Sequence, residues 1–82
     1  MSIELLKNYV YCGREIEFRY KDRMFSVTYA TTPQMGRVIS FCEFYKNPVD
    51  VKTVDELLQV EWYGERFEKI WKSLTQEDIW IY

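Results

Sequence analysis

The alternation of apolar and polar residues between positions 14 and 29 limits what this chain can fold into more than any other feature. Apolar side chains occupy every second position in both halves of this segment: Ile16, Phe18, Tyr20, Phe25, Val27 and Tyr29. A period of two is typical of strands that bury one face. Because only Lys21-Asp22-Arg23 separates the halves, the sequence predicts a β-hairpin over residues 14–29.

A third apolar segment, residues 37–45, predicts another strand. It is rich in Val, Ile, Phe and Tyr, and both of its alternating sets of residues are mostly apolar. This composition is typical of a central strand that is covered on both faces. The tail, residues 79–82, is β-branched and aromatic, so it can form a short final strand at a sheet edge.

Three segments have helical patterns. Residues 3–11 follow the capping residue Ser2 and precede Gly13, which is typical of a position just past a helix C-terminus. Thr53 and Glu56 have the spacing of a capping box and predict a helix over residues 54–60. An apolar stripe predicts a helix over residues 65–73.

These elements define an α+β fold class and one domain, residues 1–82, without a linker or a repeat. The expected architecture is a three- or four-stranded antiparallel sheet, built from the β-hairpin 14–29 and the strand 37–45, packed against two or three short helices. Within the helix 65–73, Trp71 lies on the apolar stripe with Phe67 and Ile70. We therefore expect Trp71 to be a core residue rather than a ligand-binding one.

Charge, hydropathy and cysteine content indicate where in the cell the protein is expected and which partners are less favoured. Residues 1–46 carry seven basic and five acidic side chains, and residues 47–82 carry four and eight, a mild polarity that falls short of the dense charge of a DNA-binding domain. No apolar stretch is long enough to span a membrane, and Glu4 and Lys7 interrupt any signal peptide. The expected location is cytoplasmic, where Cys12 and Cys42 would be small buried residues.

Few residues suit catalysis. The chain has no His and only two Cys, and its three Gly are isolated, so catalytic triads, Cys₄ zinc sites and phosphate-binding loops are excluded. Glu61, Glu65 and Glu68 would share a helix face if the third helix began early, but solvated faces carry such runs routinely. We therefore expect no enzyme activity, no cofactor and no metal site.

The aromatic content favours binding instead. Fifteen aromatic residues are too many for so small a core, and Tyr and Trp are enriched at interface hot spots. The leading hypothesis is a non-catalytic protein-binding accessory factor. The candidate partner contacts are Trp62, Tyr63, Trp80, Tyr82, Arg19 and Arg23. An exposed sheet edge with surplus aromatic residues also favours a homodimer as a further possibility.

The alternative hypothesis is single-stranded nucleic-acid binding. Arg19, Lys21 and Arg23 gather near the predicted hairpin turn, and Tyr20, Phe25 and Tyr29 could offer stacking surfaces beside them. Against this hypothesis, the three aromatic residues belong to the alternation of a core face. Nucleic acid is therefore the less favoured partner.

Several short motifs resemble those of small, mostly uncharacterised proteins of Gram-positive bacteria and of their phages and mobile elements. The motifs are Gly13-Arg14-Glu15-Ile16-Glu17-Phe18, the hairpin, Val54-Asp55-Glu56-Leu57-Leu58, and Gly64 with Ile70-Trp71. The resemblance covers most of the chain and concerns the fold. It implies that the partner is a host protein, for example a defence nuclease.

Overall fold

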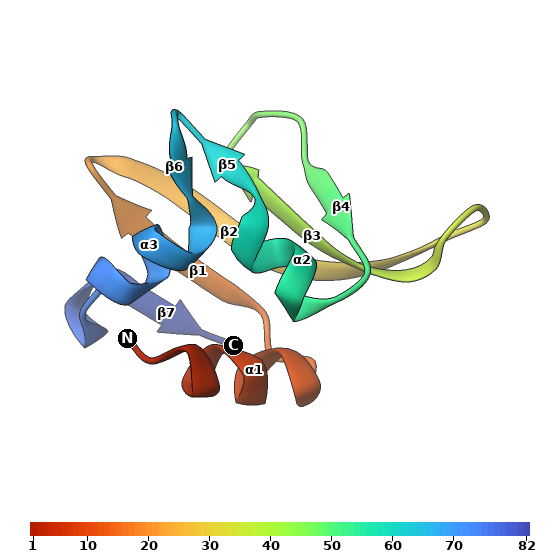
Figure 1. The fold of residues 1–82 in the computed structure, drawn as a ribbon, viewed down its shortest axis with the longest axis horizontal. Helices are drawn as coiled ribbons and strands as arrows, with labels where there is room; N and C mark the ends of the chain where they lie inside the picture. Colours follow the sequence, from red (N-terminus) through yellow and green to blue (C-terminus); the bar gives the residue numbers. More distant parts are fainter.

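A computed structural model describes all residues, 1–82, as a five-stranded antiparallel sheet with three helices against one face (Figure 1). The elements in chain order are α1 (Ile3–Tyr11), β1 (Ile16–Tyr20), β2 (Arg23–Thr32), β3 (Gly36–Glu43), β4 (Val49–Val51), α2 (Val54–Gln59), β5 (Glu61–Trp62), β6 (Glu65–Arg66), α3 (Phe67–Ser73), the 3₁₀ helix η1 (Gln76–Asp78) and β7 (Ile79–Ile81). The sheet order is β4-β3-β2-β1-β7, and β5 and β6 form a separate hairpin. None of the helices has the length and apolarity needed to cross a bilayer.

The α+β class and the antiparallel sheet are confirmed, but the sheet has five strands rather than three or four. The tail forms β7, which pairs with β1 at one edge, as the sequence allowed. The short strand β4 pairs with β3 at the other edge and was not predicted, because three residues after Asn47-Pro48 are too few to show a period. The capping box of Thr53 with Glu56 is also present.

Glycine ends α1 in the way the sequence predicts. Gly13 has a φ of +69°, its amide donates to the carbonyl of Val10, and the next amide, of Arg14, donates to the carbonyl of Tyr9. This pair of bonds is a Schellman motif, which satisfies carbonyls that the helix leaves free. It also sets the direction in which the chain enters β1.

The β1–β2 hairpin has a two-residue turn of uncommon sequence. Its register pairs Phe18 with Phe25 and Tyr20 with Arg23, so Lys21 and Asp22 alone connect the strands. Their φ angles are +50° and +62°, and positive φ at both positions defines a type I′ turn. Such turns favour Asn-Gly, because other residues are strained in the left-handed region.

An Asp22→Gly variant is expected to be more stable than the wild type. Glycine removes the left-handed strain, which outweighs its greater freedom in the unfolded chain, for a net gain of about 0.5–1 kcal/mol. The melting temperature should rise by about 2–8 °C. Asp50→Gly, in the extended backbone of β4, is the control and should lower it. A lower melting temperature for Asp22→Gly would contradict the turn type.

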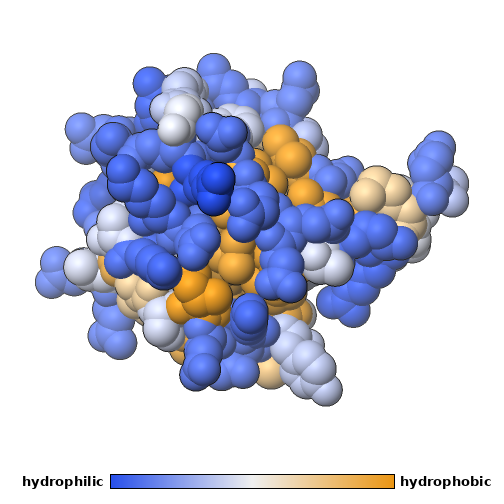
Figure 2. Space-filling model, viewed as in Figure 1, coloured by the Kyte–Doolittle hydropathy of each residue, from blue (hydrophilic) through white to orange (hydrophobic).

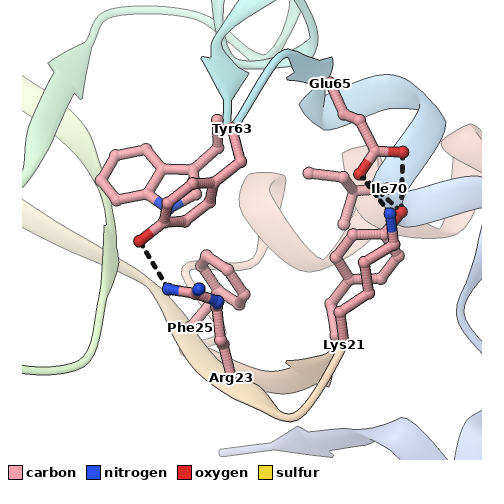
Figure 3. A pocket seen from close by; sticks show the side chains of 8 residues that line it. Lys21, Arg23, Phe25, Tyr63, Glu65 and Ile70 are labelled. Carbon is pink, nitrogen blue, oxygen red and sulfur yellow. Dashed lines mark hydrogen bonds and ion pairs between the residues drawn. The ribbon is translucent and has the colours of Figure 1, made fainter.

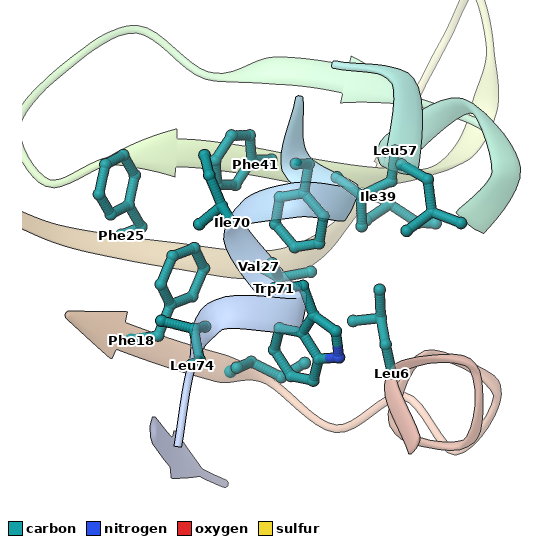
Figure 4. Close-up of a cluster of buried hydrophobic side chains, with 13 residues drawn as sticks. Leu6, Phe18, Phe25, Val27, Ile39, Phe41, Leu57, Ile70, Trp71 and Leu74 are labelled. Atoms are coloured by element: carbon teal, nitrogen blue, oxygen red, sulfur yellow. The ribbon is translucent and has the colours of Figure 1, made fainter. Parts of the chain in front are cut away.

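The core lies between one face of the sheet and the helices (Figure 4). Phe18, Phe25 and Phe41 stack side by side on the sheet, with ring centroids 5.1–6.2 Å apart. Trp71 of α3 meets the ring of Phe18 edge-on at 6.5 Å and is fully buried. The prediction that Trp71 is a core residue facing the sheet is therefore confirmed.

The opposite face of the sheet has no helix on it, so the expectation that β3 is covered on both faces holds only in part. All three helices contribute their buried residues to the core on the other side. On the uncovered face Val38 is buried, but Ser40 and Cys42 are only half-buried. Cys12 is exposed. The cysteines are therefore not the buried residues that their isolation suggested.

The helix predicted over residues 65–73 begins two residues later, at Phe67. The residues before it form the β5–β6 hairpin, whose turn is Tyr63-Gly64 with φ angles of +54° and +80°. This is a second type I′ turn. The glycine that interrupts the helical pattern therefore marks a hairpin.

Candidate binding pocket between two hairpin turns

A cavity of about 280 Å³ lies between the β1–β2 turn and the β5–β6 turn (Figure 3). Its lining residues are Tyr20, Lys21, Arg23, Phe25, Trp62, Tyr63, Glu65 and Ile70, and we call this cavity the hairpin pocket. Phe25 and Ile70 belong to the core, so the pocket reaches the apolar interior. Figure 3 shows the aromatic side chains of β5 and its turn on one side and Glu65 with Lys21 on the other.

On the face seen in Figure 1, surface of high hydropathy is limited to patches among hydrophilic residues (Figure 2).

One side of the pocket is held by Glu65. Its carboxylate accepts a hydrogen bond from the hydroxyl of Tyr20, at 2.9 Å to each oxygen, and another from Lys21 Nζ at 3.1 Å. We call these three residues the Glu65 cluster. The cluster ties the β5–β6 hairpin to the turn of the β1–β2 hairpin.

The other side is held by Glu43, at the end of β3. Its Oε1 accepts from the hydroxyl of Tyr63 at 2.7 Å and from Trp62 Nε1 at 3.3 Å, and its Oε2 accepts from Arg23 Nη1 at 3.4 Å. Arg23 Nη1 also donates to the Tyr63 hydroxyl at 2.7 Å. We call these four residues the Glu43 cluster. Glu43 is the only buried charged residue of the chain, and these three donors explain how it is tolerated there.

Tyr63 is held in a strained conformation. A φ of +54° is uncommon for a residue with a bulky side chain and persists only where the surroundings enforce it. Here the hydroxyl bridges Glu43 and Arg23, and the guanidinium lies 4.3 Å from the centre of the Tyr63 ring in a cation–π contact. The Glu43 cluster thus fixes an aromatic wall of the pocket in place.

Both carboxylates are held in their ionised form. The hydrogen bond from Tyr63 lowers the pKa of Glu43, with smaller contributions from Trp62 and Arg23. Hydrogen bonds from Tyr20 and then Lys21 lower the pKa of Glu65. In return, the hydrogen bond to Glu43 raises the pKa of the Tyr63 phenol. The pocket therefore carries two carboxylates, two cations and neutral phenols at neutral pH.

The structure divides the six candidate contacts into two groups. Trp62, Tyr63 and Arg23 meet in the hairpin pocket. The others lie along β1 and β7, where Trp80 pairs with Glu17 and points to the uncovered face of the sheet. They are Arg19, Trp80 and Tyr82.

Among the candidate contacts, Trp62 is only partly accessible. Its indole is half-buried, because it packs edge-on against Phe25 at 6.2 Å and Phe41 at 5.6 Å. Trp80 and Tyr82 remain exposed. Trp62 is therefore a wall of the pocket and a part of the core boundary at once.

The predicted stacking platform for nucleic acid is not assembled. Phe25 is buried in the core, and the hydroxyl of Tyr29 donates to the carbonyl of Arg14. Arg19 forms an ion pair with Asp78 at 3.9 Å, on the face of β1 opposite to Arg23. The cations near the turn therefore do not line one continuous surface.

Both Glu43 and Glu65 organise the pocket, but sequence reasoning missed Glu43 and considered Glu65 only as part of a solvated helix face. The three glutamates that a longer helix would align do not share a face: Glu61 and Glu65 lie on β5 and β6, and Glu68 pairs with Lys72 on α3. Two-residue strands show no period. The available signal was Gly64 two positions after Trp62, which fits a tight hairpin turn.

This chain matches no protein-family model, and no curated protein or solved structure is significantly similar to it.

Proposed function

We propose that this chain is a non-catalytic, protein-binding accessory factor that holds one apolar side chain of its partner in the hairpin pocket. The observation that carries the proposal is a pocket with an apolar floor, set between two hydrogen-bonded clusters that fix its walls. A rigid site loses little conformational entropy on binding. Its walls include Trp, Tyr and Arg, the residue types that dominate interface hot spots.

The size of the pocket suits a single side chain of a partner. Pockets for drug-sized ligands enclose roughly 300–1,000 Å³. The hairpin pocket, at about 280 Å³, is just below that range and opens to solvent beside exposed Lys21 and Arg23. One large apolar side chain fits within such a space while the rest of the partner lies across the two turns.

The state of the carboxylates supports a non-catalytic role. A carboxyl group that acts as a general acid at neutral pH needs a raised pKa. The pKa values of Glu43 and Glu65 are lowered, and all four of their oxygens accept hydrogen bonds from the protein. These groups hold the walls of the pocket. The resemblance to phage and mobile-element proteins further implies a host protein as the partner.

Selection from a phage-displayed library of random peptides tests the proposal. Peptides that share an apolar anchor should be enriched on the immobilised protein, and their affinity should fall at least tenfold for a Tyr63→Asn variant. Asn-Gly is the preferred sequence of a type I′ turn, so this variant keeps the β5–β6 hairpin while it removes a wall of the pocket.

Tyr45→Asn is the matched control. Tyr45 also has a left-handed φ, +68°, but it is fully exposed and does not line the pocket. The control should bind the selected peptides as the wild type does. No enrichment, or equal loss of binding in both variants, would refute the proposed function.

A further inference from the structure

Around the hairpin pocket, more hydrogen-bond donors than carboxylate oxygens are left without a partner in the protein. Every carboxylate oxygen of Glu43 and Glu65 already accepts at least one hydrogen bond, and the Tyr63 hydroxyl both donates and accepts. In contrast, Lys21 Nζ uses one of its three donors, and Arg23 uses only Nη1. The cations of the pocket therefore keep free donors, whereas each carboxylate oxygen already faces a donor of the protein.

The exposure of the charges strengthens this imbalance. The side chains of Lys21 and Arg23 are 69% and 48% exposed, whereas those of Glu65 and Glu43 are 20% and 11% exposed. The two carboxylates are thus less exposed than the cations, and their ion pairs hold the cations in place. A ligand that enters the pocket meets the cationic ends first, so an anionic acceptor is complementary to this rim.

We infer that the partner segment carries an Asp or Glu side chain next to its apolar anchor, and that Arg23 and Lys21 bind this carboxylate. The inference rests on the proposed function and specifies its ligand. Arg23 Nε and Nη2 are the free edge of the guanidinium, which suits a two-point contact with a carboxylate. Lys21 lies on the other side of the pocket, beside Glu65, and attracts the same charge (Figure 3).

The aromatic surfaces favour a protein carboxylate over a nucleic-acid phosphate. Stacking of bases needs free ring faces. One face of the Tyr63 ring is covered by Arg23, and Trp62 packs edge-on against two Phe rings.

The test uses the selected peptides and their neutral analogues. Replacement of the acidic residue of a peptide by Asn or Gln should weaken its binding to the wild type about tenfold. The same replacement should change binding to an Arg23→Gln, Lys21→Asn double variant less than threefold, because both cations that bind the carboxylate are gone, and each single variant should show an intermediate loss. Lys21→Asn keeps a residue that tolerates the left-handed turn.

Arg19→Gln is the control, since Arg19 lies on the same hairpin but faces the other side of the sheet. It should bind acidic and neutral peptides as the wild type does. Selected peptides without an acidic residue, or with equal affinity for their neutral analogues, would overturn this inference and leave the proposed function standing. Displacement of the peptide by a short oligonucleotide at physiological salt would overturn it as well, and so would dependence on the peptide's own C-terminal carboxylate.

Discussion

A Trp71→Ala variant is expected to show no cooperative thermal unfolding transition. The indole is fully buried, stacks on Phe67 with centroids 6.2 Å apart, and meets Phe18 edge-on. Loss of a buried Trp or Phe costs roughly 3–5 kcal/mol, because the lost contacts leave a cavity. A core this small rarely provides more than about 5 kcal/mol of net stability, so the loss removes most of it. Circular dichroism during heating measures the effect.

Two further variants separate packing from hydrogen bonding at Trp71. Its Nε1 donates to the carbonyl of Ser2 at 2.8 Å, which ties the start of α1 to α3. Trp71→Phe removes this bond but keeps an aromatic ring, so it should retain a cooperative transition at a lower temperature. Trp80→Ala, on the uncovered face, should melt close to the wild type. A near-normal transition for Trp71→Ala would show that the core does not depend on this residue.

The parts of the fold that the sequence predicts best are those with a regular period or a local signal. Phe18 and Phe25 alternate with polar residues, and that alternation alone places both in the core. Thr53 and Glu56 are three residues apart, and their capping box depends only on that spacing. Such features need no knowledge of distant parts of the chain.

The hairpin pocket depends on distant parts of the chain, and for this reason the sequence does not reveal it. Glu43 faces the core because it pairs with Phe25 in the register of β2 and β3. Its donors come from Arg23, twenty positions earlier, and from Tyr63, twenty positions later. An apolar pattern cannot identify a buried carboxylate, because the residue breaks that pattern. The candidate residues Trp62, Tyr63 and Arg23 were found by type, without the carboxylates that position them.

Replacement of Glu43 is the second change for which we expect a large effect. In Glu43→Gln the charge is lost and an amide group faces the donors of Tyr63, Trp62 and Arg23. The amide keeps one acceptor oxygen for Tyr63 and Trp62, but its NH₂ group turns donors toward Arg23 Nη1, so the ion pair with the guanidinium is lost. We expect the melting temperature at pH 7 to fall by at least several degrees and binding of the selected peptides to weaken at least tenfold, since Arg23 loses its ion pair with Glu43 and keeps only its contacts with Tyr63. Glu68→Gln, which removes only the exposed pair with Lys72, should change neither.

The pH dependence of stability provides an independent measurement of the same network. Because the pKa of Glu43 is lower in the folded protein than its ordinary value of 4.5, the ionised carboxylate stabilises the folded state. That contribution is complete above about pH 4.5 and is lost as the pH falls through the folded pKa. Tyr63 stays neutral across this range, since the pKa of its phenol is raised from 10.0. Between pH 5 and pH 3, the melting temperature of Glu43→Gln should therefore fall less than that of the wild type.

The acid dependence that remains in Glu43→Gln should come in part from the Glu65 cluster, where hydrogen bonds from Tyr20 and Lys21 lower the pKa of Glu65 in the same direction. A Glu43→Gln, Glu65→Gln double variant is expected to flatten the dependence further than either single change. The two carboxylates hold opposite sides of one pocket without sharing a donor, so their effects on melting temperature should add. An acid transition in the double variant as steep as that of the wild type would show that neither cluster contributes to stability as described.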